Sequence, residues 1–311
     1  MKQKKFLKTA TPYMFIMPWI IGFLVFTIGP LILSLIMSFF DWPITSAPVF
    51  RGFGNYIEMF TSDKQFWKSL VISLKYAAIF VPLNMIIALF LAMLITQPVR
   101  GVKVFRTIFY IPAVISGVAV SIIWGWIRNG DYGVLNYLLS LIGIEGPQWL
   151  VDPAWALLAV IIASAFGVGT MMLIFYTDIK NIPIDVYEAA SIDGAGPARK
   201  FFSITLPIIT PTILFNLITS IISSFQQVTL VMLLTGGGPL KSTYFYGLYT
   251  YNNAFKHHKL GYASANAWVM FIIILILTAL VFKSSSAWVF YETEARNGGA
   301  KKSKKKKGGK K

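Results

Sequence analysis

The sequence predicts an all-α polytopic membrane protein with six transmembrane helices and one short cytoplasmic helix. Three observations predict this class. Of the 311 residues, 56% are hydrophobic and only 13% are charged, whereas soluble domains carry about 25% charged residues. Six apolar stretches reach roughly the 20 residues that a helix needs to cross a bilayer. These stretches are continuously apolar rather than alternating, which excludes a membrane β-barrel.

The predicted spans divide the chain into one membrane domain with short ends. In order, they are Tyr13–Phe40, Val71–Thr96, Ile108–Ile127, Trp155–Thr177, Ile208–Leu234 and Ala265–Phe282. The first span is too long for a cleaved signal peptide and has no small-residue cleavage site, so we interpret it as a retained anchor. We expect residues 1–12 to form a cytoplasmic N-terminus. Residues 13–296 would form the membrane domain, with its main loop at 178–207, and residues 297–311 a disordered Lys-rich tail.

Basic residues near the span ends predict the orientation, because cytoplasmic loops carry an excess of Lys and Arg. With six spans, four segments fall on one side, and these contain Lys2, Lys4, Lys5, Lys8, Arg100, Lys103, Arg106, Lys180, Arg199, Lys200, Arg296 and the Lys tail. The opposite side has basic residues such as Arg51 and Arg128, spread over longer loops. Both termini are therefore expected in the cytoplasm.

The composition excludes several kinds of function. The chain has no Cys and only two His, His257 and His258, and adjacent histidines in a predicted outer loop suit a solvated surface better than a metal site. Eight of the 28 basic residues lie in the C-terminal tail, so half of the +16 net charge comes from it. A Lys/Gly tail is typical of a solvated segment near anionic lipid rather than of a nucleic-acid site.

No chemistry for an enzyme or an energy-coupled carrier is visible within the spans. All twelve acidic residues fall in predicted loops or at helix ends, whereas proton-driven pumps generally need an ionisable relay inside the membrane. The Gly-rich segment 236–243 has Leu240 where a P-loop requires Gly before Lys241. We therefore predict a chain that is not an enzyme and binds no cofactor. If it transports uphill, a partner must supply the energy.

The loop between the fourth and fifth spans contains a predicted amphipathic helix. Pro183 suits its first turn and Gly194 its end. Asp185 and Glu188 lie near its N-terminus, where the helix dipole favours carboxylates. Ile184, Tyr187 and Ser191 share one face, with Glu188 and Ile192 beside them. Such a helix fits a groove on another protein or lies on lipid headgroups, and these residues alone leave both readings open.

Five motifs in order resemble the sugar-permease branch of ABC-importer permeases, over nearly the whole chain. They are Phe53-Gly54-Asn55-Tyr56, Phe105-Arg106-Thr107 with Tyr110-Ile111-Pro112, the loop Glu188-Ala189-Ala190 with Asp193-Gly194-Ala195, the turn Thr235 to Pro239, and Gly261 to Ala265. The loop resembles the "EAA" loop of these permeases. Phe53 replaces the Leu that the branch usually has. The resemblance implies an importer permease in a bacterial cell membrane, for a sugar or oligosaccharide.

The resemblance also implies partners and a role for the loop helix. The helix would be a coupling helix that docks on a cytoplasmic ATPase through Tyr187, Glu188, Ala189, Ala190, Asp193 and Gly194. The expected partners are a second permease, two ATPase subunits that hold ATP and Mg, and an extracytoplasmic solute-binding protein, with no nucleic acid.

Polar residues in two spans are candidates for the substrate pathway. Ser220, Ser224 and Gln227 share one face of the fifth span, and the fourth span offers Ser164, Phe166, Gly167 and Thr170. By the resemblance, sugar-contacting positions fall on these two helices. Small polar residues also join helices to one another in membranes, so that role stays open. Trp124 and Trp126 suit an interfacial belt better than sugar stacking.

Three alternatives remain at this point. Another polar solute, such as glycerol-3-phosphate, is an alternative cargo; a neutral sugar is favoured because no Lys or Arg is predicted deep in a span. A secondary carrier would need an inverted repeat, which is not visible. A membrane scaffold would only tether a partner through the loop helix, and substitution of Ser224 or Gln227 would not change uptake.

Overall fold

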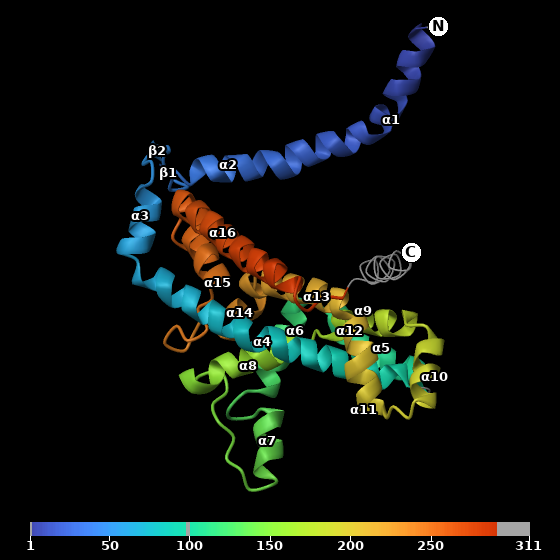
Figure 1. Ribbon diagram of the computed structural model, residues 1–311. Helices are drawn as coiled ribbons and strands as arrows, with labels where there is room; N and C mark the ends of the chain where they lie inside the picture. The colour runs from blue at the N-terminus through green and yellow to red at the C-terminus, as the bar shows by residue number, and fades with distance from the viewer. Residues whose placement is uncertain (1, 98–99, 291–311) are drawn as a thin grey trace, which may run out of the picture. The chain divides into compact units, whose positions relative to one another are not determined.

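The computed structural model describes residues 2–97 and 100–290, and this part of the chain is mainly helical, with two short strands (Figure 1). The elements up to residue 127 are α1 (Lys2–Phe23), η1 (Leu24–Ile28), α2 (Gly29–Met37), β1 (Phe40–Asp41), β2 (Val49–Phe50), α3 (Gly54–Thr61), α4 (Lys64–Thr96), α5 (Val102–Val114) and α6 (Gly117–Ile127). Next come α7 (Val134–Ser140), α8 (Pro153–Ala165), α9 (Gly169–Asn181), α10 (Ile184–Ile192), α11 (Pro197–Lys200), η2 (Phe201–Thr205) and α12 (Leu206–Ile208). The last are α13 (Thr210–Phe225), α14 (Thr229–Leu234), α15 (Tyr246–Tyr251), η3 (Asn252–Lys256) and α16 (Leu260–Ser285). The predicted all-α fold is confirmed; the predicted tail at 297–311 lies outside the described residues.

Three helical segments are long and apolar enough to cross a membrane unaided. They are Tyr13–Met37, Lys64–Thr96 and Leu260–Ser285, which match the first, second and sixth predicted spans. Three bent helix pairs raise the number of candidate spans to six if each pair is one span. Tyr13–Met37 exposes apolar side chains on every side, as expected of a helix that faces lipid or another subunit.

The third, fourth and fifth spans are not the continuous helices that the sequence predicted. The third bends by 101° between α5 and α6, where Ile115 and Ser116 are extended and the Ser116 hydroxyl caps α6 at Ala119. The fourth bends by 49° between α8 and α9. These breaks were missed because hydropathy does not register where the backbone turns.

The fifth span is also placed differently. The bent pair runs over Pro197–Ile208 and Thr210–Phe225, with a 66° bend, rather than over the predicted Ile208–Leu234. Prolines at the first turns of α12 and α13 favour new helix starts there. The chain then leaves the helix at Gln226 and restarts as α14.

The chain divides into two compact units, and each is described by itself. Unit 1 comprises Met1–Lys68 and Tyr249–Ile272, and unit 2 comprises Ser69–Leu248 and Ile273–Lys311. Within unit 1, β1 and β2 pair antiparallel, with Phe40 opposite Phe50. The buried Asn55 amide donates hydrogen bonds to the main-chain oxygens of Ser38 (2.8 Å) and Phe40 (2.9 Å). This amide therefore satisfies carbonyls where α2 ends and β1 begins.

A second cluster in unit 1 surrounds Asp63, which precedes α4. One carboxylate oxygen accepts hydrogen bonds from the main-chain nitrogens of Gln65 (2.8 Å) and Phe66 (3.1 Å), as an N-cap does. The other accepts from the hydroxyls of Tyr249 and Tyr262. Burial alone would raise the pKa of Asp63, but the hydrogen bonds from both tyrosines and the two amides outweigh it and hold this pKa below 3.8.

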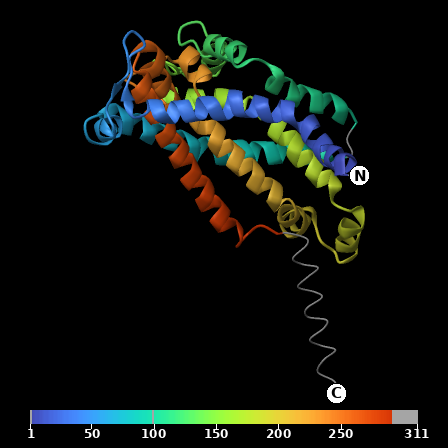
Figure 2. The ribbon, with the colours of Figure 1, turned by 90° about the horizontal axis from the view of Figure 1, so that it is seen from above.

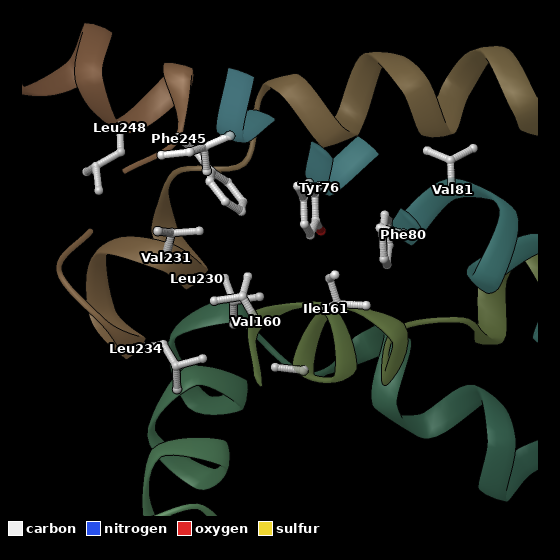
Figure 3. Close-up of a cluster of buried hydrophobic side chains, with 12 residues drawn as sticks. Tyr76, Phe80, Val81, Val160, Ile161, Leu230, Val231, Leu234, Phe245 and Leu248 are labelled. Carbon is white, nitrogen blue, oxygen red and sulfur yellow. The ribbon is translucent and has the colours of Figure 1, made fainter. Parts of the chain in front are cut away.

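Unit 2 contains two clusters of buried apolar side chains. Figure 3 shows the first, which α4, α8, α14 and the segment 245–248 build around Tyr76 and Phe80. The second lies around the C-terminal half of α4 and α9, and includes Met172, Phe175 and Ile209. Gly169 lets α9 approach α5 closely, since a Cβ there would lie 2.5 Å from the Phe109 oxygen. In both views of the ribbon, α7 and α10, which both belong to unit 2, lie well apart (Figures 1 and 2).

Candidate functional site

The helix α10 begins and ends through local backbone chemistry. Pro183 stands immediately before its first residue rather than inside the first turn, and Asp185 lies in that turn. Gly194 has φ +74°. The amide of Gly194 donates to the Ser191 oxygen (3.0 Å) and the amide of Ala195 to the Ala190 oxygen (2.9 Å), which is a Schellman arrangement. The predicted helix stop at Gly194 is confirmed.

One side of α10 is held by contacts with the rest of unit 2. The Tyr187 hydroxyl is 2.8 Å from that of Thr205, and the ring packs against the second apolar cluster. The Lys200 ammonium donates to the Ser191 hydroxyl (2.7 Å). A groove of about 1020 Å³ lies beside α10. It is lined by residues that precede α10 in the sequence, such as Pro183, and by residues that follow it, such as Phe201. Tyr187 therefore positions the helix from within the chain.

The rest of α10 is exposed. Ile192 is 87% exposed and Ile184 66% exposed, although both are apolar. Of the residues predicted to dock on an ATPase, Glu188, Ala189, Asp193 and Gly194 are exposed, and Tyr187 and Ala190 are half-buried. A helix that is rigidly held on one side and apolar on the exposed side has the form of a docking element.

Two of the predicted pathway residues, Ser164 and Gln227, lie near the hydroxyl of Tyr76. This residue of α4 is fully buried, and its hydroxyl faces the side chains of Ser164 from α8 and Gln227, which follows α13. Nevertheless the hydroxyl has no full hydrogen-bond partner among the described residues. In Figure 3 the hydroxyl oxygen points toward α8. The structure thus assembles a polar point inside an apolar cluster from three separate segments.

The other predicted pathway residues do not all join this point. Ser220 and Ser224 are buried, and the Ser224 hydroxyl donates to the Ile221 oxygen of its own helix (2.7 Å). Thr170 lines a separate cleft of about 440 Å³ with Tyr110, Asp178 and Thr212. Gly167 is exposed at the bend between α8 and α9. Ser164 and Gln227 therefore lie at Tyr76 and Thr170 lies in its own cleft, while Ser220, Ser224 and Gly167 join neither place.

Phe166 connects to an aromatic and basic group at the end of α6. Its ring is edge-on to that of Trp124, with centroids 5.5 Å apart. Trp124 packs against the first apolar cluster and its indole nitrogen is buried, so the expectation of an interfacial belt is wrong for it. Trp126 is 69% exposed. The Arg128 guanidinium lies 4.3 Å above the Trp124 ring.

Arg128 corrects a second expectation. The sequence placed it among the basic residues of the outer loops, but it caps the end of α6 and only 1% of it is exposed. Its side chain folds back onto α8, where Nη1 donates to the Ala159 oxygen. A basic side chain is therefore buried next to the predicted pathway, contrary to the argument that favoured a neutral cargo. The hydropathy pattern did not identify Arg128 or Tyr76 as candidate site residues. It does not show which way a side chain turns at the end of a helix, and it does not single out one hydroxyl within an apolar stretch.

The fold and the site define an all-α membrane protein with polar points between its helices and an exposed short helix, α10. Comparison with protein families makes this specific. The chain belongs to the family described as binding-protein-dependent transport system inner membrane component, whose model matches residues 84–290. It is therefore the membrane component of a transport system rather than an enzyme.

Individual relatives agree with the family. The chain is 44% identical to the probable ABC transporter permease protein YesP of Bacillus subtilis, over 91% of this chain and 92% of the relative. It is 30% identical to the trehalose/maltose transport system permease protein MalF of Thermococcus litoralis, over 90% and 95% of the two chains. Among solved structures, a bacterial ABC transporter that imports the acidic polysaccharide alginate has a subunit with the same fold, with a TM-score of 0.79, 24% identity, and coverage of 92% and 99%.

Proposed function

We propose that this chain is the permease subunit of an ATP-binding-cassette importer that moves a sugar or oligosaccharide into the cytoplasm. Family membership makes it a membrane component of a binding-protein-dependent system. Support for the cargo comes from relatives whose names state trehalose and maltose, or lactose in Rhizobium radiobacter. The single observation that carries the coupling role is the exposed apolar side of α10, which residues 2–97 and 100–290 leave uncovered.

In this proposal α10 transmits force between a cytoplasmic ATPase and the spans. Ile192 and Glu188 would enter a cleft of the ATPase, while Tyr187 and Thr205 hold the helix to unit 2. Closure of two ATPase subunits on ATP would move α10 as a rigid lever, and the attached α9 and α11 would follow. Tyr187 would thus pass the motion on rather than touch the partner.

The remaining parts of the proposal concern partners and orientation. A second, homologous permease subunit would complete the pathway. An extracytoplasmic solute-binding protein would deliver the cargo, and two ATPase subunits would hold ATP and Mg. Both termini would lie in the cytoplasm, on the same side as α10, with α7 on the opposite side. The wide separation of α7 from α10 within unit 2 supports this orientation (Figures 1 and 2).

Along the pathway, the polar point at Tyr76 would contact the cargo. Hydroxyl-rich ligands need donors and acceptors set in an otherwise apolar wall, and Tyr76, Ser164 and Gln227 provide this arrangement. Thr170, in its separate cleft with Asp178, would lie farther along the route. The alternative cargo, glycerol-3-phosphate, is to be compared with sugars in the same uptake assay.

The coupling role is tested by purifying the tagged chain in mild detergent and identifying its partners by mass spectrometry. We expect an ATPase and a second permease to copurify with the wild type, and only the ATPase to be lost from Glu188→Arg. The matched control is Glu145→Arg, an equal charge reversal at an exposed residue between α7 and α8, which should retain both partners. An ATPase that remains bound to Glu188→Arg, or no ATPase at all, would contradict α10 as the docking helix.

A further inference from the structure

Arg128 is a buried cation that the described part of the chain leaves incompletely paired. It is among the largest fully buried side chains, and Nε and Nη2 both lack a hydrogen-bond partner. No acidic side chain of residues 2–97 and 100–290 forms an ion pair with it. A guanidinium stays protonated in proteins, and a buried charge without a partner is costly. An oxyanion from outside the chain would remove this cost.

The two free nitrogens define the shape of the missing group. Nε and Nη2 point to the same edge of the planar guanidinium, and that edge matches the two oxygens of a carboxylate in a bidentate pair. The opposite nitrogen, Nη1, is already used by the Ala159 oxygen. The face of the group is covered by the Trp124 ring. Arg128 is thus fixed on two sides and offers one complete edge.

The contact that holds Arg128 is also easily given up. Ala159 lies inside α8, so its carbonyl is also the acceptor of the helix's own hydrogen bond. Release of Arg128 therefore leaves no orphaned carbonyl on α8. The edge of Arg128 can turn toward a ligand when packed helices separate during transport.

Neighbouring groups extend the same chemistry toward the predicted pathway. The Trp124 indole nitrogen and the Tyr76 hydroxyl are buried and also lack a full hydrogen-bond partner within the described part of the chain. Trp124 contacts Phe166, and Tyr76 faces Ser164 and Gln227. The Arg128 guanidinium, the Trp124 indole and the Tyr76 hydroxyl can each donate a hydrogen bond. What all three need is therefore an acceptor oxygen. A sugar supplies hydroxyl oxygens, and a sugar acid adds a carboxylate for Arg128.

We propose that Arg128 binds the carboxylate of an acidic saccharide, so that the cargo class is a sugar acid or an oligosaccharide that contains uronic acids. This inference rests on the proposed sugar-permease function and narrows it. The competing role is structural, in which Arg128 only fastens α6 to α8.

The test measures binding to the complex of this chain with its copurified subunits, in detergent and without the binding protein, because that protein selects cargo as well. The probes are uronic-acid oligosaccharides from partial hydrolysis of plant and algal polysaccharides, and the same pools after reduction of their carboxyl groups to alcohols. Tryptophan fluorescence follows binding, since Trp124 is in contact with Arg128. We compare the wild type with Arg128→Gln, Arg128→Lys and the control Arg51→Gln, an exposed arginine paired with Glu58.

We expect the wild type to bind the acidic pool about tenfold more tightly than the reduced pool, as loss of one charge-assisted pair implies. Arg128→Gln should lose this preference, Arg128→Lys should keep part of it, and Arg51→Gln should match the wild type. Equal loss of both pools in Arg128→Gln, or no change, would leave Arg128 with a structural role only. If Arg128→Gln does not assemble, equal binding of both pools by the wild type would overturn the inference.

Uptake by the complete transport system in proteoliposomes tests the acidic cargo separately from the proposed sugar-permease function. Import of neutral saccharides alone would overturn the acidic cargo and keep the sugar permease. Import of no saccharide, neutral or acidic, would overturn the proposed function and the inference with it.

Discussion

Two motif-bearing regions of this chain use their residues in opposite ways. In unit 1, Asn55 donates to two main-chain oxygens at the start of β1, and Gly261 lies against the same strand. In unit 2, the motif on α10 leaves Glu188, Ala189 and Asp193 exposed, beside an Ile192 that is 87% exposed. Both motifs resemble those of one family. The residues of the first motif make contacts within the chain, whereas most residues of the second are exposed.

The difference separates folding motifs from docking motifs. When all polar groups of a motif form hydrogen bonds within the chain, a contribution to stability is enough to account for the motif. A motif that exposes apolar side chains on a rigid helix needs a partner to explain it. We therefore expect substitutions in the first region to lower stability, and substitutions on the exposed side of α10 to change partner binding while stability stays the same.

The largest loss of stability is expected for Gly261→Ala. A Cβ at this position would lie 1.9 Å from the Phe40 oxygen and 3.1 Å from the Met37 oxygen. Both are main-chain atoms, so the start of α16 would have to move away from β1, at a cost of about 3 kcal/mol. We expect little monodisperse protein in fluorescence-detected size-exclusion chromatography. Gly22→Ala, in a helix with nothing within 4 Å of the new Cβ, is the control and should be recovered like the wild type.

Gly261 also shows what the sequence can and cannot predict. Hydropathy and charge were sufficient for the all-α class, for three single spans and for the position of α10, because each depends on local composition. The 101° bend near Ser116 depends on packing between segments distant in sequence, because α5 contacts α9 while α6 contacts α14. The close approach at Gly261 and the inward turn of Arg128 depend on partners distant in sequence. The candidate site was therefore predicted in part: Ser164 and Gln227 do lie together, but Tyr76 and Arg128, which complete the arrangement, were missed.

A smaller loss is expected at Asp63, and it depends on pH. The folded-state pKa of Asp63 is held below 3.8 by hydrogen bonds, so its contribution to stability is complete above that value. The contribution is lost as the pH falls from there through the lower folded pKa. Asp63→Asn should cost about 1.5 kcal/mol at neutral pH, the usual value for hydrogen bonds to a charged group.

Thermal unfolding at several pH values, from neutral to about pH 3, checks the Asp63 prediction. The difference in melting temperature between wild type and Asp63→Asn should shrink as the pH approaches the acid end. A difference that stays constant with pH would show that the charge on Asp63 does not contribute. Because Asn retains a capping oxygen, the variant isolates the charge.

The smallest effect on stability, and the sharpest test of the comparison, is expected for Ile192→Ser. The Ile192 side chain is almost fully exposed at the end of α10, so its replacement should change the free energy of unfolding by no more than about 0.5 kcal/mol. If α10 enters a cleft on an ATPase, the same change removes an apolar anchor from the interface and should weaken copurification about tenfold.

Tyr187→Phe is the counterpart, since it removes only the hydroxyl that contacts Thr205. It should lower the melting temperature slightly and keep the ATPase bound. The reverse pattern, in which Ile192→Ser destabilises the chain and Tyr187→Phe releases the ATPase, would mean that the internal and external sides of α10 are assigned the wrong way round.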